Sequence, residues 1–173
     1  MESKKKAIYV HGLGSGAAST TIDIVRKVFS DYEWTPVEVN EDPVDSVNII
    51  NHTIGQLHPA LLMGTSLGGL YLMYADMDSC EDNAIRFIFN PACDIARVIR
   101  ETIGFGTKEY FVPRLDGIQE YILDESVCAR FENFIAGYQP TSGKRDYALF
   151  SINDEPLGPG GVVTKQRGRA VAG

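Results

Sequence analysis

The chain has 173 residues, of which 44% are hydrophobic and 23% are charged, a composition typical of one soluble globular domain. Its net charge of −7 disfavours nucleic acid as a partner, because phosphate binding needs a basic surface. No apolar run approaches the ~20 residues of a membrane span, and the basic N-terminus is followed by an apolar run of residues 7–10 only. We therefore expect a cytoplasmic protein with no membrane partner.

The first part of the chain alternates predicted strands with predicted helices. A short apolar strand at residues 6–10 leads into a glycine-rich loop, His11–Gly14, and Ser19 or Thr20 then caps a helix. One face of that helix carries Ile22, Val25, Val28 and Phe29. Residues 34–40 predict a second strand. Pro43 begins a second helix, whose buried stripe is expected to hold Val44, Val47, Ile50, Ile54 and Leu57.

Ser66 lies in the stretch around which the chain is organised. Residues 60–64 predict a buried strand, residues 64–68 read Gly-x-Ser-x-Gly, and residues 67–77 predict a helix. A strand, a sharp turn and a helix are the context in which this motif forms a nucleophile elbow. Such a turn strains the serine backbone and lifts the hydroxyl above the carboxyl edge of the sheet. The N–H of Leu67 would then face a developing oxyanion.

The second half predicts two more strands separated by a long connection. Residues 85–89 form a strand that ends in Asn90, a helix follows from Asp94 to Ile103, and residues 146–152 form a strand before Asp154. Residues 116–137 read as mostly helical, with an apolar face of Ile118, Tyr121, Ile122, Phe131, Phe134 and Ile135. The gap of roughly 55 residues predicts a small helical insertion, residues 92–140, over the sheet edge. Its aromatic residues either line an apolar acyl site or belong to the core: Phe105, Tyr110 and Phe111.

This alternation predicts an α/β fold, a three-layer sandwich with a mostly parallel sheet. Ligands of such sheets bind beyond the carboxyl ends of the strands, where the His11–Gly14 loop, Ser66, Asn90 and Asp154 converge. The acidic residues 76–82 fit no calcium loop, so we expect no metal. Cys80, Cys93 and Cys128 are odd in number and widely spaced, which predicts reduced thiols rather than disulfides.

Three motifs in this order resemble the α/β-hydrolase superfamily, and within it the small bacterial YqiA-like esterases. They are the strand with the His11–Gly12–Leu13–Gly14 loop, the elbow around Ser66, and the strand before Asn90–Pro91. The resemblance covers residues 6–157 and implies a hydrolase domain over residues 1–157, with residues 92–140 as its cap. It implies Ser66 as nucleophile, the N–H groups of Leu13 and Leu67 as oxyanion hole, and Asp154 as the acid. It places His11, Gly12, Gly14 and Asn90 around the site, with His11 supporting the loop, and it requires no cofactor.

The chain departs from the pattern of the family at the general base. The triad order in this fold is serine, acid, histidine, yet no histidine follows Asp154. Either His11 acts as the base or the base is absent, so we expect an impaired enzyme that lacks the C-terminal histidine-bearing segment. Residues 158–173 hold five glycines and no acidic residue, which predicts an irregular, disordered tail. An exposed sheet edge left by a missing strand would favour a homodimer.

Three functions remain open on these residues. The first is hydrolysis of a small-molecule ester or thioester through an acyl-Ser66 intermediate. The second is a non-catalytic α/β domain that binds an acyl ligand or a protein partner. The third is dinucleotide binding, because Gly12-x-Gly14-x-x-Ala17 follows a strand and Glu38 or Asp42 lies about 20 residues further on.

Overall fold

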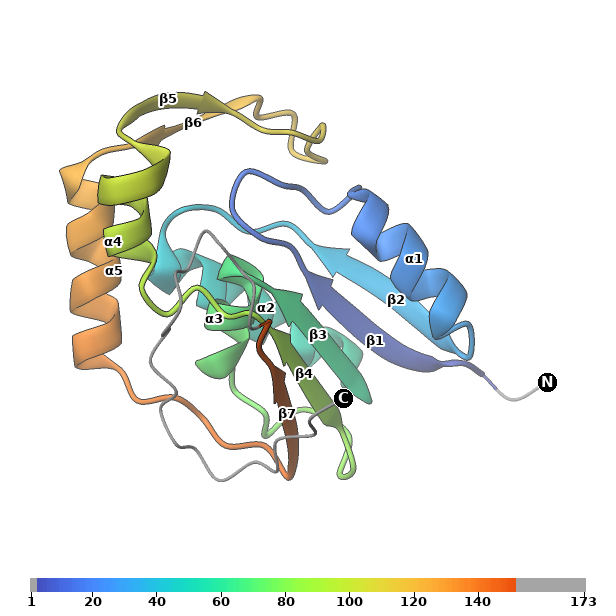
Figure 1. Cartoon of the computed structure of the whole chain (residues 1–173). Helices are drawn as coiled ribbons and strands as arrows, with labels where there is room; N and C mark the ends of the chain where they lie inside the picture. Colours follow the sequence, from blue (N-terminus) through green and yellow to red (C-terminus); the bar gives the residue numbers. More distant parts are fainter. Residues whose placement is uncertain (1–2, 152–173) are drawn as a thin grey trace.

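A five-stranded parallel sheet forms the centre of the molecule, in the strand order β2-β1-β3-β4-β7 (Figure 1). The computed structural model describes residues 3–151, so Asp154 and residues 158–173 lie outside the described residues. The predicted α/β class with a mostly parallel sheet is confirmed. The strands are β1 (Lys5–Val10), β2 (Tyr32–Val37), β3 (Leu61–Thr65), β4 (Ile85–Phe89) and β7 (Arg145–Leu149).

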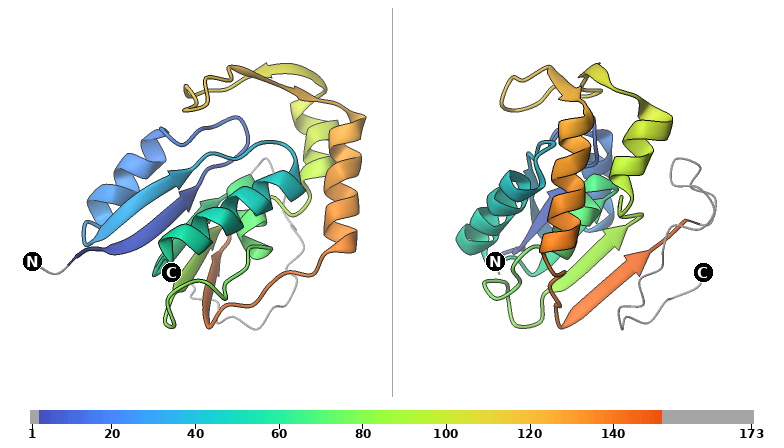
Figure 2. Two further views of the ribbon diagram at one scale, coloured as in Figure 1. Left: turned by 180° about the vertical axis from the view of Figure 1, so that it is seen from behind. Right: turned by 90° about the vertical axis from the view of Figure 1, so that its left-hand side faces the viewer.

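Helices cover both faces of this sheet. Helix α1 (Thr20–Val28) lies on one face, and α2 (Pro43–Leu57) and α3 (Leu67–Met73) lie on the other (Figures 1 and 2). Successive residues of a strand point to opposite faces. In β1, Ile8 and Val10 therefore join the core under α2 and α3, whereas Ala7 and Tyr9 join the core under α1.

Local signals at the helix ends explain where α2 begins and ends. The Asp42 carboxylate accepts hydrogen bonds from the N–H groups of Val44 and Asp45, and Pro43 occupies the first turn. His58 ends the helix in the left-handed conformation. Ser19 occupies the N-cap position of α1 as predicted, but its hydroxyl makes no capping hydrogen bond.

Arg86 joins strands β4 and β7 beneath α3. Although it is 1% exposed, all five of its N–H donors are used, by Asp146, by Thr141 and by the carbonyl of Leu72. A buried charge is tolerated only with such a complete set of partners. This polar link fixes β7 as the last described strand of the sheet.

The predicted helical insertion between β4 and β7 is helical only in part. Helix α4 (Ile95–Val98) continues into the π-helical turn η1 (Ile99–Ile103), and a β-hairpin follows before helix α5 (Glu125–Gly137). The hairpin pairs β5 (Gly106–Glu109) with β6 (Glu120–Leu123), over part of the range predicted as helix. Along β6, burial alternates with period two: Tyr121 and Leu123 are buried and Ile122 is exposed. The hairpin, α4 and α5 stand beyond the carboxyl ends of the strands (Figures 1 and 2).

Several predicted boundaries and core positions also need correction. Strand β2 ends at Val37 rather than at residue 40, and α3 ends at Met73 rather than at residue 77. Four side chains predicted to lie on apolar helix faces are instead exposed: Val28, Val44, Ile118 and Ile122. Val28 and Val44 sit at the edges of helical stripes, where one residue of helical rotation decides burial, whereas Ile118 and Ile122 lie in the hairpin and not in a helix. Within residues 3–151, no helix combines the length and the apolar character needed to cross a membrane.

Candidate active site

Ser66 occupies a strained turn between β3 and α3. Its backbone angles are φ 52° and ψ −118°, a conformation that costs a non-glycine residue about 1–3 kcal/mol. Three hydrogen bonds fix it: its N–H donates to Phe89 O (2.9 Å), and its carbonyl accepts from Leu70 (3.0 Å) and Ala92 (3.1 Å). The side chain is exposed, and within residues 3–151 its hydroxyl has no hydrogen-bond partner. The turn therefore presents a free hydroxyl.

The glycines of the motif allow α3 to contact the sheet at backbone distance. A Cβ at Gly68 would lie 2.3 Å from the carbonyl oxygen of Val10 and 2.5 Å from that of His11. A Cβ at Gly64 would lie 2.6 Å from the carbonyl oxygen of Gly68. Both contacts are shorter than any side chain tolerates, so only glycine lets the helix begin directly above β1 and β3.

The loop after β1, residues 11–19, passes beside Ser66; we call it the post-β1 loop. A Cβ at Gly12 would lie 3.2 Å from Ser66 Cβ and 3.7 Å from its Oγ. Within residues 3–151, the N–H groups of Leu13 and Leu67 donate no hydrogen bond. Two backbone donors next to a serine hydroxyl are the components of an oxyanion hole.

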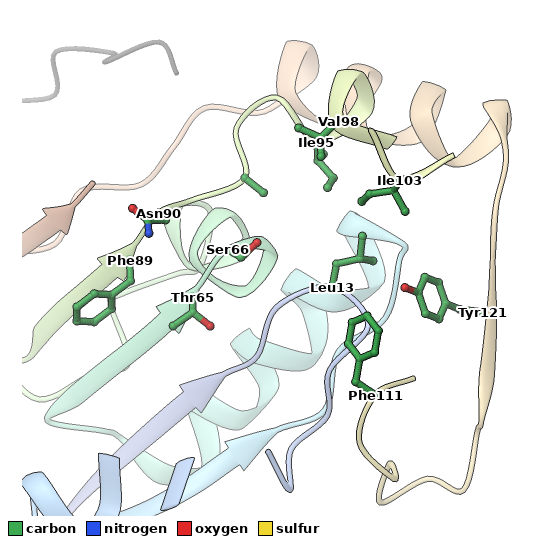
Figure 3. A pocket seen from close by; sticks show the side chains of 11 residues that line it. Leu13, Thr65, Ser66, Phe89, Asn90, Ile95, Val98, Ile103, Phe111 and Tyr121 are labelled. Atoms are coloured by element: carbon green, nitrogen blue, oxygen red, sulfur yellow. The ribbon is translucent and has the colours of Figure 1, made fainter. Parts of the chain in front are cut away.

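A cavity of about 400 Å³ opens in front of Ser66. In Figure 3 the Ser66 hydroxyl faces the space bordered by Leu13 and by Ile95 and Val98. Among residues 3–151, no charged side chain lines the cavity, so this part of the wall suits an uncharged, mostly apolar ligand. Its lining comprises Leu13, Thr65, Ser66, Phe89, Asn90, Ala92, Ile95, Val98, Ile103, Phe111 and Tyr121.

Only some of the predicted site residues line the cavity. Leu13, Ser66 and Asn90 line the cavity, and the Asn90 side-chain oxygen also accepts from the N–H of Ser151 (2.5 Å). Gly14 lies behind the lining, where a Cβ would meet the Phe111 ring at 2.8 Å. Of the three aromatic residues proposed for an acyl site, Phe111 alone lines this cavity.

The contributions of Ile95, Val98 and Tyr121 were not foreseen from the sequence. The sequence predicts a helix for Ile95 and Val98 but not which of its faces points to the site. It predicts a helix at Tyr121 as well, where the structure has strand β6. Apolar residues immediately after Asn90, in a connection that must cross the carboxyl edge, were the available signal.

His11 contacts the neighbouring strand end rather than the cavity. Its Nδ1 lies 2.9 Å from the carbonyl of Gly12, and its Nε2 accepts from the N–H of Val39 at 3.2 Å. Glu38 Oε1 also lies 2.9 Å from Nε2. A hydrogen bond between these two atoms would require a proton on Nε2, but Nε2 already accepts the N–H of Val39 and so carries none. We assign a neutral ring protonated on Nδ1, because burial is the largest effect and lowers the pKa of His11. Both ring nitrogens are therefore engaged, and His11 supports the post-β1 loop.

The lowered pKa of His11 gives the protein a pH-dependent stability. Below the ordinary value of 6.5 the unfolded chain binds a proton that the folded chain excludes, so the free energy of unfolding falls as pH falls. The slope from this group is at most about 1.4 kcal/mol per pH unit. We expect His11→Gln to flatten the slope, measured by urea unfolding between about pH 5.5 and pH 7. An unchanged slope in this variant would show that His11 is not the group responsible.

No histidine of the sequence lines the cavity. His58 binds the carbonyl of Ser79 (2.7 Å) at the end of α2, next to the start of β3, and His52 is exposed on α2. Asp94, which also follows a strand of the sheet, forms an ion pair with Arg97 (2.5 Å) at the start of α4. The site therefore holds a serine and backbone donors, without an imidazole from His11, His52 or His58.

No protein-family model matches this chain, and no curated protein matches it. The site itself must therefore indicate the function. Within residues 3–151, no three His, Cys, Asp or Glu side chains are grouped so that they could hold a metal ion. The three cysteines are free, and burial raises the pKa of Cys80 to about 11 and also raises the pKa values of Cys93 and Cys128. These thiols are therefore poor nucleophiles at neutral pH.

Proposed function

We propose that this chain is a serine hydrolase of the α/β-hydrolase type that cleaves esters or thioesters with an uncharged, apolar acyl group. The observation that carries the proposal is the strained backbone of Ser66, whose free hydroxyl lies in the 400 Å³ cavity. Backbone strain of this kind persists where the surrounding structure enforces it, and it concentrates at functional sites. The uncharged side chains that the described part of the chain contributes to the lining favour an acyl chain over a charged substrate.

In the proposed reaction, Ser66 Oγ attacks the carbonyl carbon of the substrate. The N–H groups of Leu13 and Leu67 stabilise the oxyanion of the tetrahedral intermediate. The intermediate collapses as the C–O or C–S bond breaks, and the serine proton leaves with the alcohol or thiol. Water then attacks the acyl-Ser66 ester, which releases the acid and restores the hydroxyl. No histidine lies at the cavity to assist either step; for an ester with a good leaving group we expect deacylation to be the slow step, because it must expel the serine oxygen, a poorer leaving group.

The geometry disfavours the dinucleotide alternative. Glu38, one of the two acids that could bind a ribose, accepts hydrogen bonds from the N–H groups of Ala17 (3.2 Å) and Leu115 (3.0 Å) and faces Arg114. Asp42 caps α2 and lies 3.4 Å from Arg130. Both carboxylates are occupied by the protein itself.

A fluorophosphonate probe tests whether the hydroxyl is reactive. We expect covalent labelling of the full chain at Ser66, localised by peptide mass spectrometry, because the probe reacts with activated serines. Ser66→Ala should abolish labelling, while the remaining serines, such as Ser126 on α5, provide an internal control for unspecific reaction. A folded wild-type protein that remains unlabelled would instead support the non-catalytic acyl-binding domain.

A further inference from the structure

Arg114 is a buried arginine in the hairpin loop, by which we mean residues 110–119 between β5 and β6. Its side chain is 3% exposed, and its Nη1 donates to the carbonyl of Val39 (2.6 Å) and lies 3.3 Å from Glu38 Oε1. Asp116 accepts hydrogen bonds from Nε and Nη2. Arg114 therefore ties the hairpin loop to the segment that follows β2.

Glu38 extends this link to the post-β1 loop. Its carboxylate accepts from the N–H of Ala17 (3.2 Å) in that loop and from the N–H of Leu115 (3.0 Å) in the hairpin loop. A second contact joins the same two loops, because the N–H of Phe111 donates to the carbonyl of Gly14 (2.7 Å). The two loops are thus fixed to each other at two points.

These contacts flank the oxyanion donor Leu13. On one side of it, a Cβ at Gly12 would lie 3.2 Å from the Cβ of Ser66. On the other side, Gly14 is bonded to Phe111 and is packed so closely that a Cβ would lie 2.8 Å from its ring. The place of the Leu13 N–H relative to Ser66 therefore depends on where the hairpin loop is held.

We propose that Arg114 is a positioning residue for the acylation of Ser66. Together with Glu38 it fixes the hairpin loop on the post-β1 loop and so holds the Leu13 N–H at the oxyanion position. This role rests on the proposed hydrolase function. Removing the guanidinium leaves the half-buried Glu38 carboxylate without its counter-ion, which favours rearrangement of both loops. A displacement of about 1 Å at a reacting centre can cost about 100-fold in rate.

The test measures fluorophosphonate labelling of Ser66 at increasing probe concentration, which separates the maximal rate, kinact, from the apparent affinity, KI. We expect Arg114→Met to lower kinact about 100-fold with little change in KI, because the misplaced group is an oxyanion donor. Arg114→Lys should restore part of this rate, since lysine keeps the positive charge facing Glu38 but lacks the planar guanidinium that donates several hydrogen bonds at once. Amide hydrogen exchange at Ala17 and Leu115 should accelerate in Arg114→Met, because both N–H groups depend on Glu38.

Arg86 provides the matched control, since its side chain is as buried as that of Arg114 and forms an ion pair with Asp146 (2.6 Å) between β4 and β7. Arg86→Lys should lower the melting temperature without changing kinact, whereas Arg114→Lys lowers kinact. The double variant Glu38→Gln/Arg114→Met should label as slowly as Arg114→Met alone, because the two residues act through one link.

Three results would overturn the positioning role while leaving the hydrolase proposal intact. Labelling of Arg114→Met and Arg114→Lys at the wild-type kinact would show that the link does not act on Ser66. An equal loss of kinact in Arg86→Lys would show general loosening of the fold instead. Unchanged exchange at Ala17 and Leu115 would show that the loops are held without Arg114. A wild-type protein that is not labelled at all overturns the hydrolase proposal itself, and the positioning role with it.

Discussion

Ser66→Ala is expected to eliminate the burst of p-nitrophenol that the wild-type chain releases from a p-nitrophenyl ester. The wild type should release about one molecule per chain quickly and then turn over slowly, because p-nitrophenolate leaves readily in acylation, whereas deacylation must expel the serine oxygen without a histidine at the cavity. Without the hydroxyl no acyl intermediate forms, so the burst amplitude should fall to zero. Stopped-flow absorbance with an apolar acyl ester measures this amplitude.

Ser66→Cys is the matched control for this experiment. A thiol is intrinsically more nucleophilic than a hydroxyl and depends less on a general base, so this variant should retain a burst. A burst that persists in Ser66→Ala would place the reacting group elsewhere. Rapid linear turnover by the wild type, at the rate of an ordinary esterase, would contradict slow deacylation and would require a base outside the three histidines.

Gly68→Ala should have the largest effect on stability. Its methyl group would lie 2.3 Å from the carbonyl oxygen of Val10 and 2.5 Å from that of His11. Because both oxygens belong to the backbone and cannot rotate away, α3 must move away from β1. We expect a loss of about 3 kcal/mol in the free energy of unfolding, despite the ~1 kcal/mol that alanine gains over glycine in a helix. Urea unfolding followed by circular dichroism measures this loss.

Gly55→Ala separates the close contact from helix propensity. Gly55 also lies in a helix, α2, but a Cβ there meets nothing within 4 Å. This variant should therefore gain about 0.5–1 kcal/mol. A Gly68→Ala protein as stable as the wild type would show that the elbow does not need the close approach described above.

The elbow and the sheet could be predicted because their signals are local and agree with one another. Residues 85–89 are bounded as predicted, and the glycines around Ser66 have a geometric reason that the motif already implied. The hairpin could not be predicted in the same way. Ile118, Tyr121 and Ile122 fit a helical spacing as well as a strand, and a strand of only four residues has too few positions to establish period two.

Long-range polar contacts were also beyond prediction from the sequence. Glu38 and Arg114 are 76 positions apart, and nothing in either neighbourhood indicates that the two form a pair. The same is true of Arg86. Its charge is unexpected within an apolar strand, and only the structure shows that Asp146 and Thr141 accept its hydrogen bonds. The early end of β2 follows from these contacts, because Glu38 and Val39 leave the sheet to bind His11, Ala17 and Arg114.

The intact mass of the protein after brief exposure to an apolar p-nitrophenyl ester tests most directly whether Ser66 is the nucleophile. We expect the mass to increase by one acyl group, with the acyl group on the peptide that contains Ser66 and none on Ser66→Ala. An unmodified wild-type protein that has nonetheless consumed the ester, or an acyl group on another residue, would contradict the account.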